Sequence, residues 1–339
     1  MLIHGAVNAE FSQYQMTGLA NETMHGEQAR LVYLDFLVCP ACKGQLRWAR
    51  EHIRCSGCPQ TYPIVDGIPV LASESTKTDH DELEHVVGPA EKQDQARFFD
   101  RYSVAEFEVN RPHGAPRLYE WQMREKFRRA VARLPQAEPG GWAFVACGGS
   151  GMDAEFLAEL GYRVITSDIS LGAAKRAAVR ARQRRLPVGS IVADVEHLPL
   201  RDRSIQLVYV HDGLHHIEEP MMGLAEILRV ALLAVSVTEP ARSSITAMAV
   251  RLGLARDWEE SGNRVARLAL PEAQRVLTAN GFHMAAGKRY AMYYKHQPGL
   301  PTRLLSRSGL FQVATTIWRL GNCLIGRAGN KLSITGVRD

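Results

Sequence analysis

The chain has 339 residues, of which 46% are hydrophobic and 23% are charged, and this balance is ordinary for a globular protein with a sizeable core. No uninterrupted apolar run reaches the roughly 18–20 residues that span a bilayer, and the N-terminus lacks a signal-peptide pattern, so we expect a cytoplasmic protein without an integral membrane segment. The formal net charge of +5 permits contact with nucleic acid or an acidic substrate without requiring either. These properties predict one small and one large domain.

The first hundred residues divide by composition. Residues 1–30 show no sustained periodicity and are predicted to be a mobile tail. Residues 31–72 end in two short apolar runs joined by Asp66-Gly67, which predicts a compact β-ribbon. Residues 73–95 are mostly polar and acidic, so we interpret them as the linker to the large domain, residues 96–339.

The predicted ribbon contains two C-x-x-C turns, formed by Cys39, Cys42, Cys55 and Cys58. Each turn presents two sulfurs to one ion, so together they supply the four thiolates of a closed, structural Zn²⁺ site. Two disulfides or a redox pair are the alternatives, but a reducing compartment favours thiolates available to metal. A module of about 35 residues is too small for an adequate core and would draw its folding energy largely from the metal.

The ribbon sequence resembles a known family along residues 37–46, 55–58 and 62–69. This is the zinc-ribbon family typified by the small activator subunit of eukaryotic tRNA and protein methyltransferases. In that family the ribbon stabilises a methyltransferase partner, so the resemblance implies a scaffolding role for this module.

The large domain alternates predicted strands and helices, after an opening helix over residues 119–134. Strands are predicted at 141–146, 163–167, 190–193, 205–210 and 232–238, and helices at 152–160, 172–185 and 223–230. This alternation predicts an α/β fold with a Rossmann-like, doubly wound parallel sheet.

Three features in order stand at the carboxyl ends of the first three strands. The glycine turn 147–151, with Gly149 and Gly151, lets the backbone approach a cofactor, and the next helix supplies amides. Asp168 ends the second strand, where a carboxylate can accept hydrogen bonds from both ribose hydroxyls. Asp194 ends the third strand and is placed to receive an adenine amino group.

Together with the segment Gly213-Leu214-His215-His216-Ile217, these motifs resemble class I S-adenosylmethionine-dependent methyltransferases of the small-molecule type. The resemblance implies S-adenosyl-L-methionine as the cofactor. The residues that it assigns to cofactor binding are Gly149, Gly151, Asp168, Ile169, Asp194, Val195 and Asp212. A nicotinamide dehydrogenase is the main rival, but Asp194 and the histidine-containing segment favour the methyl donor.

Three residues depart from the family's pattern, and one of them is Gln206, where the family has Asp before the core of the fourth strand. Val145 stands where the family has an acidic residue that holds the donor's amino group, and Cys147 replaces the first glycine. The amino group must then be held by backbone carbonyls or by another residue.

Three histidines, His211, His215 and His216, follow the fourth strand, which in this architecture faces the transferable methyl group. Methyl transfer is an in-line displacement that needs a base only when the acceptor loses a proton. Histidine titrates near neutrality, so these three are the candidate catalytic residues; the alternative is that one of them packs against the following helix.

Further segments are candidates for the acceptor side. Residues 111–114 and 290–297 are placed to roof the pocket, with Arg or Lys binding an anionic substrate. Residues 304–325 mix apolar groups with arginines and predict a helical lid at about 300–328, before a final strand at 331–337. The same amphipathic pattern is also compatible with a membrane interface.

The leading hypothesis is methylation of an oxygen, nitrogen or carbon on a small metabolite, lipid precursor or glycan. RNA methylation is the alternative, because one predicted helix carries Lys175, Arg176, Arg180, Arg182, Arg184 and Arg185. A non-catalytic scaffold with a degenerate cofactor fold is a third hypothesis. The sequence does not choose among acceptors or fix the oligomeric state.

Overall fold

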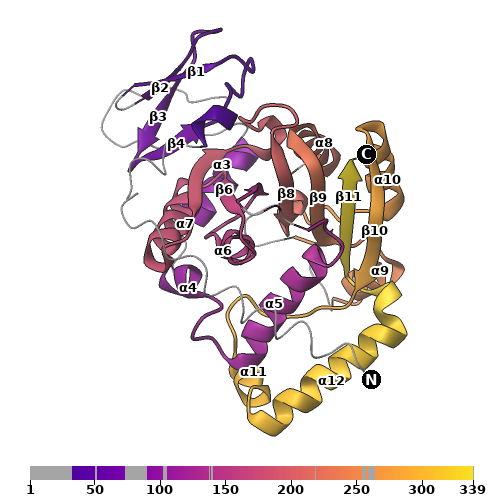
Figure 1. Cartoon of the computed structure of the whole chain (residues 1–339). Coiled ribbons are helices and arrows are strands. Elements are labelled where there is room, and N and C mark those ends of the chain that lie inside the picture. The colour runs from indigo at the N-terminus through magenta and orange to yellow at the C-terminus, as the bar shows by residue number, and fades with distance from the viewer. Residues whose placement is uncertain are drawn as a thin grey trace. The chain divides into compact units, whose positions relative to one another are not determined.

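The computed structural model describes residues 33–49, 52–72, 90–101, 105–136, 138, 140–217, 219–253, 257–258 and 264–338 (Figure 1). The predicted tail and residues 73–89 of the predicted linker lie outside the described residues. Phe36–Asp339 forms one compact unit, which is the unit described below.

The cysteine-rich segment folds into four short strands that pair in chain order, each antiparallel to the next. They are β1 (Leu46–Trp48), β2 (His52–Cys55), β3 (Thr61–Val65) and β4 (Ile68–Leu71). Asp66 and Gly67 join β3 to β4 with positive φ angles of 51° and 75°, the combination that a tight two-residue hairpin turn requires. The predicted β-rich ribbon is therefore confirmed.

The large domain contains a seven-stranded sheet in the order β7-β6-β5-β8-β9-β11-β10. Its strands are β5 (Trp142–Ala146), β6 (Arg163–Asp168), β7 (Val188–Ala193), β8 (Ile205–His211), β9 (Ala231–Pro240), β10 (Phe282–Tyr290) and β11 (Lys331–Arg338). The five strands from β7 to β9 are parallel, and β11 lies antiparallel between β9 and β10. This order confirms the predicted Rossmann-like, doubly wound sheet.

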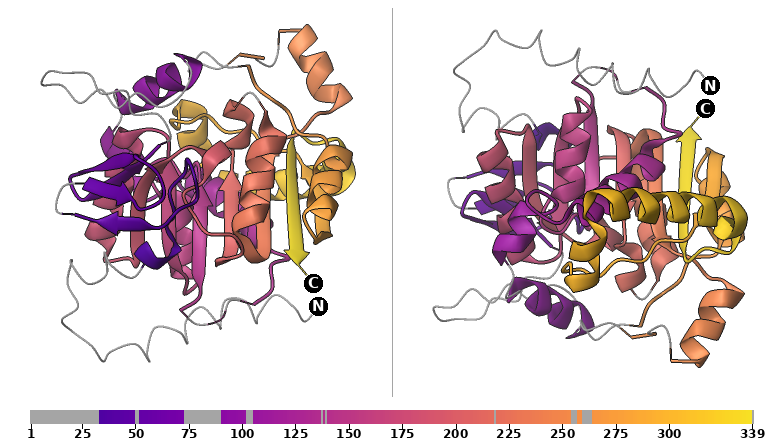
Figure 2. Two further views of the ribbon diagram at one scale, coloured as in Figure 1. Left: turned by 90° about the horizontal axis from the view of Figure 1, so that it is seen from above. Right: turned by 90° about the horizontal axis from the view of Figure 1, so that it is seen from below.

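Helices cover both faces of this sheet, and the two views in Figure 2 show α8 and α12 on opposite faces. The α-helices are α3 (Ala90–Asp100), α4 (Ala105–Asn110), α5 (Arg117–Val131), α6 (Met152–Glu159), α7 (Leu171–Arg184), α8 (Pro220–Val230), α9 (Ser244–Arg251), α10 (Leu270–Ala279), α11 (Leu300–Leu305) and α12 (Ser308–Ile325). The short 3₁₀ helices are η1 (Leu34–Phe36), η2 (Val195–His197), η3 (Leu214–His216) and η4 (Gly326–Ala328). Helix α3 begins inside the predicted linker, so the last residues of that stretch are helical.

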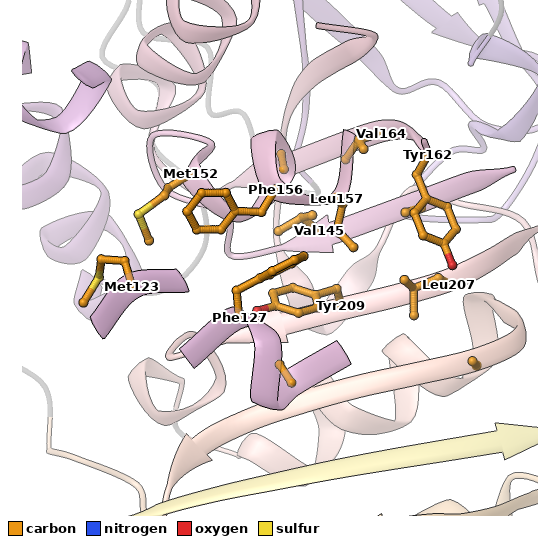
Figure 3. Packing of buried hydrophobic residues seen from close by; sticks show 14 of the residues in the cluster. Met123, Phe127, Val145, Met152, Phe156, Leu157, Tyr162, Val164, Leu207 and Tyr209 are labelled. Carbon is orange, nitrogen blue, oxygen red and sulfur yellow. The ribbon is translucent and has the colours of Figure 1, made fainter. Parts of the chain in front are cut away.

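The main core lies between the sheet and helices α5 and α6 (Figure 3). Phe127 of α5 and Phe156 of α6 pack ring against ring, with centroids 5.2 Å apart, above Tyr209 of β8. Apolar positions of α5 recur at helical spacing, so one face of the helix is buried and the other remains polar. This packing fixes the strand ends that carry the site.

The ribbon extends the same sheet, because β4 pairs in parallel with β7. Val70 lies opposite Val192 and Leu71 opposite Ala193, and Val70 and Val192 are buried together with Ala174 of α7. Lys43 adds a hydrogen bond from its Nζ to the carbonyl of Leu198, 3.1 Å away. The ribbon therefore covers an edge strand that would otherwise expose unpaired backbone groups.

Candidate cofactor and acceptor site

A cavity of about 660 Å³ lies at the carboxyl ends of β5, β6, β7 and β8. Open α/β sheets bind ligands at this edge, and the volume is within the range of sites for cofactors and small substrates. The predicted residues that line it are Gly149, Asp168, Ile169, Asp194, Val195, His211, Asp212 and His216. Gly151 and His215 are not among the described residues that line it.

The glycine turn after β5 has the shape that a cofactor cradle needs. Gly149 has a φ of +52°, and a side chain added there would meet nothing within 4 Å, so this residue is open to the cavity. A Cβ on Gly148 would lie 2.1 Å from Oγ1 of Thr166, so only glycine fits beside β6. Gly151, at φ +79°, lies against Ala177 of α7 and so serves helix packing instead of the cofactor contact expected from the sequence.

Asp168 at the end of β6 is tied to this turn. Its Oδ2 accepts the backbone N–H of Gly149 at 2.9 Å, and its Oδ1 accepts that of Ser170 at 3.0 Å. Burial raises the pKa of the carboxyl, and these hydrogen bonds oppose that rise. The side chain is thus held rigidly in the cavity wall, where the sequence predicts the ribose contact.

Asp194 at the end of β7 has a partner that the sequence did not indicate. Lys92 of α3 donates to its Oδ2 at 2.6 Å and also pairs with Glu196. Lys92 lines the cavity but stands in the stretch interpreted as a linker, so no helical pattern pointed to it. A ligand group bound at Asp194 therefore has to share the carboxylate with Lys92.

β5 and β8 are followed by Cys147 and Asp212, two non-glycine residues with left-handed φ angles of 52° and 53°. A Cβ on Gly213 would lie 2.4 Å from Cβ of Cys147, so glycine is required there. Burial raises the pKa of the Cys147 thiol well above its usual value, which keeps it neutral. Cys147 thus shapes the cavity floor without acting as a thiolate.

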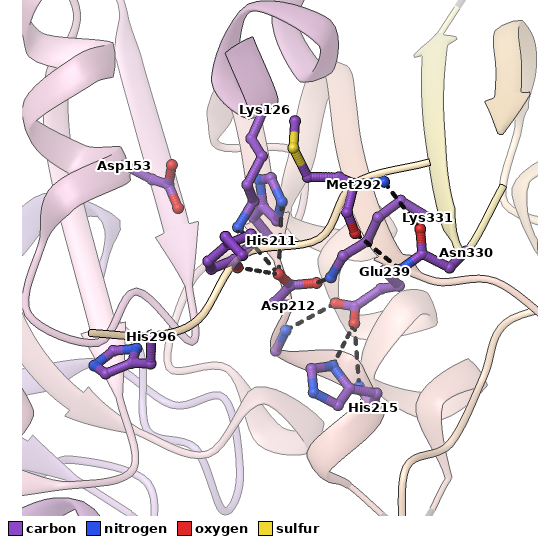
Figure 4. A network of polar contacts seen from close by, with 12 residues as sticks. Lys126, Asp153, His211, Asp212, His215, Glu239, Met292, His296, Asn330 and Lys331 are labelled. Atoms are coloured by element: carbon purple, nitrogen blue, oxygen red, sulfur yellow. Dashed lines mark hydrogen bonds and ion pairs between the residues drawn. The ribbon is translucent and has the colours of Figure 1, made fainter. Parts of the chain in front are cut away.

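Asp212 is the centre of a polar network (Figure 4). Its Oδ2 lies 3.1 Å from Nζ of Lys126 and 3.2 Å from the hydroxyl of Tyr294, and its Oδ1 pairs with Lys331. Burial alone would raise the pKa of Asp212, but the charges of the two lysines hold it well below the usual range. The carboxylate predicted to contact the cofactor is therefore already neutralised by two ammonium groups.

His211 ends β8 and lines the cavity, and its Nε2 lies 3.8 Å from Oδ2 of Asp212. Its Nδ1 lies 3.0 Å from the hydroxyl of Tyr209, which in turn lies 3.4 Å from Oδ1 of Asp153. Its buried Nε2 makes no hydrogen bond within the described part of the chain. Burial and the charge of Lys126 hold the pKa of His211 well below its ordinary value, so the imidazole is neutral.

His215 and His216 have different surroundings from His211. Nδ1 of the buried His215 lies 2.8 Å from the carboxylate of Glu239, which also binds the backbone N–H groups of Gly213 and Leu214. This position argues against the proton transfer expected of His215 and gives it a structural role in the turn. His216 lines the cavity, and its ring lies 4.1 Å from that of His215, centroid to centroid.

Asp212, His215 and Glu239 also bring three potential ligand atoms within 4.8 Å of one another. The lysines on Asp212 and the backbone amides on Glu239 account for these charges without a metal ion.

The acceptor end of the cavity includes residues from both predicted roof segments. Arg111, Tyr294 and His296 line it, and Nη1 of Arg111 lies 3.4 Å from Nδ1 of His296. None of the described residues from 300 to 328 lines the cavity. The helical segment predicted there forms two helices, α11 and α12, but α12 packs beside α5 and does not cover the cavity as the lid hypothesis required.

Asp153 is a site residue that sequence reasoning missed. It is the second residue of α6, it lines the cavity, and burial raises the pKa of its carboxyl. One signal in the sequence could have indicated it. Val145 stands where an acidic residue was expected before the glycine turn, and Asp153 is an acidic residue two positions after the same turn.

The basic helix that suggested RNA is partly structural. The Arg180 side chain is 1% exposed, and its guanidinium binds Glu155 together with the carbonyls of Ser150, Glu108 and Arg111. Arg176 donates to the carbonyl of Phe99 at 2.7 Å and lines the cavity. These two side chains are therefore not part of an open basic surface.

The four cysteine sulfurs of the ribbon all lie within 4.8 Å of one another. Sγ of Cys39 is 3.7 Å from that of Cys58, and Sγ of Cys42 is 3.4 Å from that of Cys55. Sulfurs bound to one tetrahedral zinc ion at about 2.3 Å lie about 3.8 Å apart, so the donor set and its spacing fit structural Zn²⁺.

The comparisons with known proteins agree with this fold. Residues 144–232 match the family model described as a methyltransferase domain, and residues 31–67 match that of Trm112p-like proteins. The chain therefore contains a methyltransferase domain and an N-terminal Trm112p-like zinc ribbon. The cavity at the strand ends and the four cysteine sulfurs are the positions that fit the two predicted cofactors, S-adenosyl-L-methionine and structural zinc.

Two curated relatives match separate parts of the chain. A demethylmenaquinone methyltransferase of Renibacterium salmoninarum is 34% identical over 105 residues, which cover 31% of this chain and 43% of the relative. A UPF0434 protein of Delftia acidovorans is 48% identical over 54 residues, which cover 15% of this chain and 90% of that protein. The chain thus spans less than half the length of the demethylmenaquinone methyltransferase.

Among solved structures, magnesium protoporphyrin IX methyltransferase from Synechocystis PCC 6803 with bound SAH has a TM-score of 0.50. The match covers 74% of this chain and 100% of that one at 16% identity, which supports the fold alone.

Proposed function

We propose that the protein transfers a methyl group from S-adenosylmethionine to an oxygen or carbon atom of a small acceptor of the lipid-precursor class. The observation that carries this proposal is one cavity with the Gly149 turn and Asp168 in one part of its wall and the neutral His211 in another. The relatives named demethylmenaquinone methyltransferases support an acceptor of the quinone type. The burial of Arg180 weakens the case for RNA.

The cavity wall has the features that fit the donor. The open turn at Gly149 would let the donor lie close to the protein backbone. Asp168 would accept hydrogen bonds from the ribose hydroxyls of the donor. Asp194, together with Lys92, would contact the adenine. Asp153 would hold the donor's ammonium group, because Val145 offers no carboxylate and Asp212 is already paired with two lysines.

The bound donor supplies an electrophilic methyl group on a sulfonium. The chain's own part is to align the acceptor and to remove its proton. Nε2 of His211 is the base that we assign, since it makes no hydrogen bond within the described part of the chain and a neutral imidazole can accept a proton from a hydroxyl in the cavity. Tyr209 fixes the ring through Nδ1, and Arg111 and Lys126 would stabilise the negative charge left on the acceptor.

The proposal is tested in two stages with zinc-loaded protein. Calorimetric titration with S-adenosylmethionine and S-adenosylhomocysteine, with NADH as the control, should give binding of the first two alone. Transfer of labelled methyl groups is then measured with a panel of reduced quinones and phenols, in parallel with ribosomal and transfer RNA. If RNA alone is labelled, RNA and not a lipid precursor is the acceptor. Absence of donor binding would favour the scaffold hypothesis.

A further inference from the structure

Helix α12 is attached to the molecule by one side only. The Trp318 ring lies 5.1 Å from that of Trp121 on α5, and the Arg117 guanidinium lies 4.1 Å from the centroid of the Phe311 ring. The side-chain amide of Asn322 bonds the backbone of Ala291 through both its oxygen, at 2.8 Å, and its nitrogen, at 3.1 Å. These contacts fix which face of the helix is turned outward (Figures 1 and 2).

The outward face of α12 is aliphatic. Its exposed residues are Leu310 at 47%, Val313 at 54%, Ile317 at 64%, Leu320 at 59% and Leu324 at 84%. Their spacing of three and four residues places them on one stripe along the helix. The preceding helix α11 adds Leu300, Leu304 and Leu305, which are also exposed. An apolar stripe of this length marks either a binding surface or a site of aggregation, because isolated exposed leucines would not align in this way.

The sequence that contains these two helices carries only positively charged side chains. Residues 273–338 hold ten Lys and Arg and no Asp or Glu, whereas the whole chain has 41 of the former and 36 of the latter. Outside this stretch the chain has 31 Lys and Arg (41 − 10) and 36 Asp and Glu, so the net positive charge of the whole chain comes from the C-terminal stretch. Arg303, Arg307, Arg319 and Arg327 are exposed on or beside α11 and α12.

We propose that α11 and α12 bind the surface of an anionic lipid membrane, with the aliphatic stripe of α12 inserted at the interface. An apolar face bordered by arginines is the composition that interfacial helices share, and arginines near a negatively charged leaflet add to the attraction. No helix among the described residues is long and apolar enough to cross a membrane, so the contact is peripheral.

A second copy of the chain is the competing occupant, because the same stripe is spaced like a coiled-coil seam. In such a pair the arginines of both copies would meet without any carboxylate from residues 273–338 to neutralise them. Charge complementarity therefore favours lipid headgroups over self-association.

The test is sedimentation of the full chain with vesicles of phosphatidylcholine, with and without phosphatidylglycerol. Binding should require phosphatidylglycerol and weaken as salt is raised. The double variant Ile317→Gln/Leu320→Gln should reduce the partition coefficient about tenfold or more, since two aliphatic groups no longer enter the bilayer. Met222→Gln on α8 removes an equally exposed apolar side chain, at 48%, and should bind like the parent protein.

A second variant isolates the charge. Arg303→Gln/Arg307→Gln should lose most of the preference for phosphatidylglycerol while its thermal unfolding is unchanged, because both side chains are exposed. Absence of vesicle binding, or equal binding by the stripe variant, would overturn the proposal. So would a dimer in solution, measured by light scattering, that the stripe variant converts to monomer. Vesicle binding needs no methyl donor, so this result is separate from the test of the proposed function.

Discussion

Nδ1 of His215 lies 2.8 Å from Oε2 of Glu239, and both side chains are buried. Because a carboxylate only accepts hydrogen bonds, Nδ1 carries the proton in this pair. The other oxygen of Glu239 accepts the N–H groups of Gly213 and Leu214, at 2.9 and 2.8 Å. The pair therefore holds the turn that follows β8 and keeps His211 and Asp212 at the cavity wall.

His215→Asn should lower the free energy of unfolding by about 1–3 kcal/mol, because a buried hydrogen bond to a carboxylate is weakened. The pH dependence of turnover should not change, since His215 does not lie among the described residues that line the cavity. Urea unfolding and a pH–rate profile of the same preparation test both parts. If the pH–rate profile of this variant lacks one of the two limbs seen with the parent protein, His215 has a direct catalytic role.

His211→Asn should reduce kcat by about 10²–10⁴-fold while donor affinity and unfolding stay near those of the parent, because the group lost is the assigned base. The sign of the pH dependence follows from its environment. Burial and Lys126 lower the pKa of His211, so the neutral base persists below pH 6.5, the ordinary value. The acid limb of kcat/KM should therefore lie below that pH, and a limb at or above it would exclude His211.

The sequence predicted most of the fold because strands and helices of the large domain carry clear periodicity and turn signals. It also placed Asp168, Asp194 and His211 at strand ends, which is where the topology makes them converge. Lys92 and Asp153 were missed for a different reason. Their roles depend on which side chain a folded helix turns toward the cavity, and neither stands in a recognisable motif. The orientation of α12 could not be predicted from its sequence pattern either, since amphipathicity alone does not reveal that the aliphatic face points outward.

Asp153→Asn should weaken binding of S-adenosylhomocysteine about tenfold, because a carboxylate opposite an ammonium group is lost. The matched probe is 5′-methylthioadenosine, which has the adenosine but no amino acid part. Its affinity should be unaffected by Asp153→Asn and lowered by Asp168→Asn, whose side chain is tied to the Gly149 turn. Equal losses for both ligands in the Asp153 variant would mean that the substitution disturbs the whole cavity and would remove Asp153 from ammonium binding.

Cys55→Ser should lower zinc content and also destabilise the large domain, since the ribbon's last strand pairs with an edge strand of the main sheet. Val70 and Leu71 lie opposite Val192 and Ala193, so loosening of the ribbon exposes the edge that carries Asp194. Metal analysis, thermal unfolding and hydrogen exchange of the β7 peptide should change together. Cys323→Ser, which alters an exposed cysteine on α12, is the control and should leave all three unchanged. Loss of zinc with unaltered exchange in β7 would show that the strand pairing persists without the metal, and so would contradict a role of zinc in stabilising the large domain.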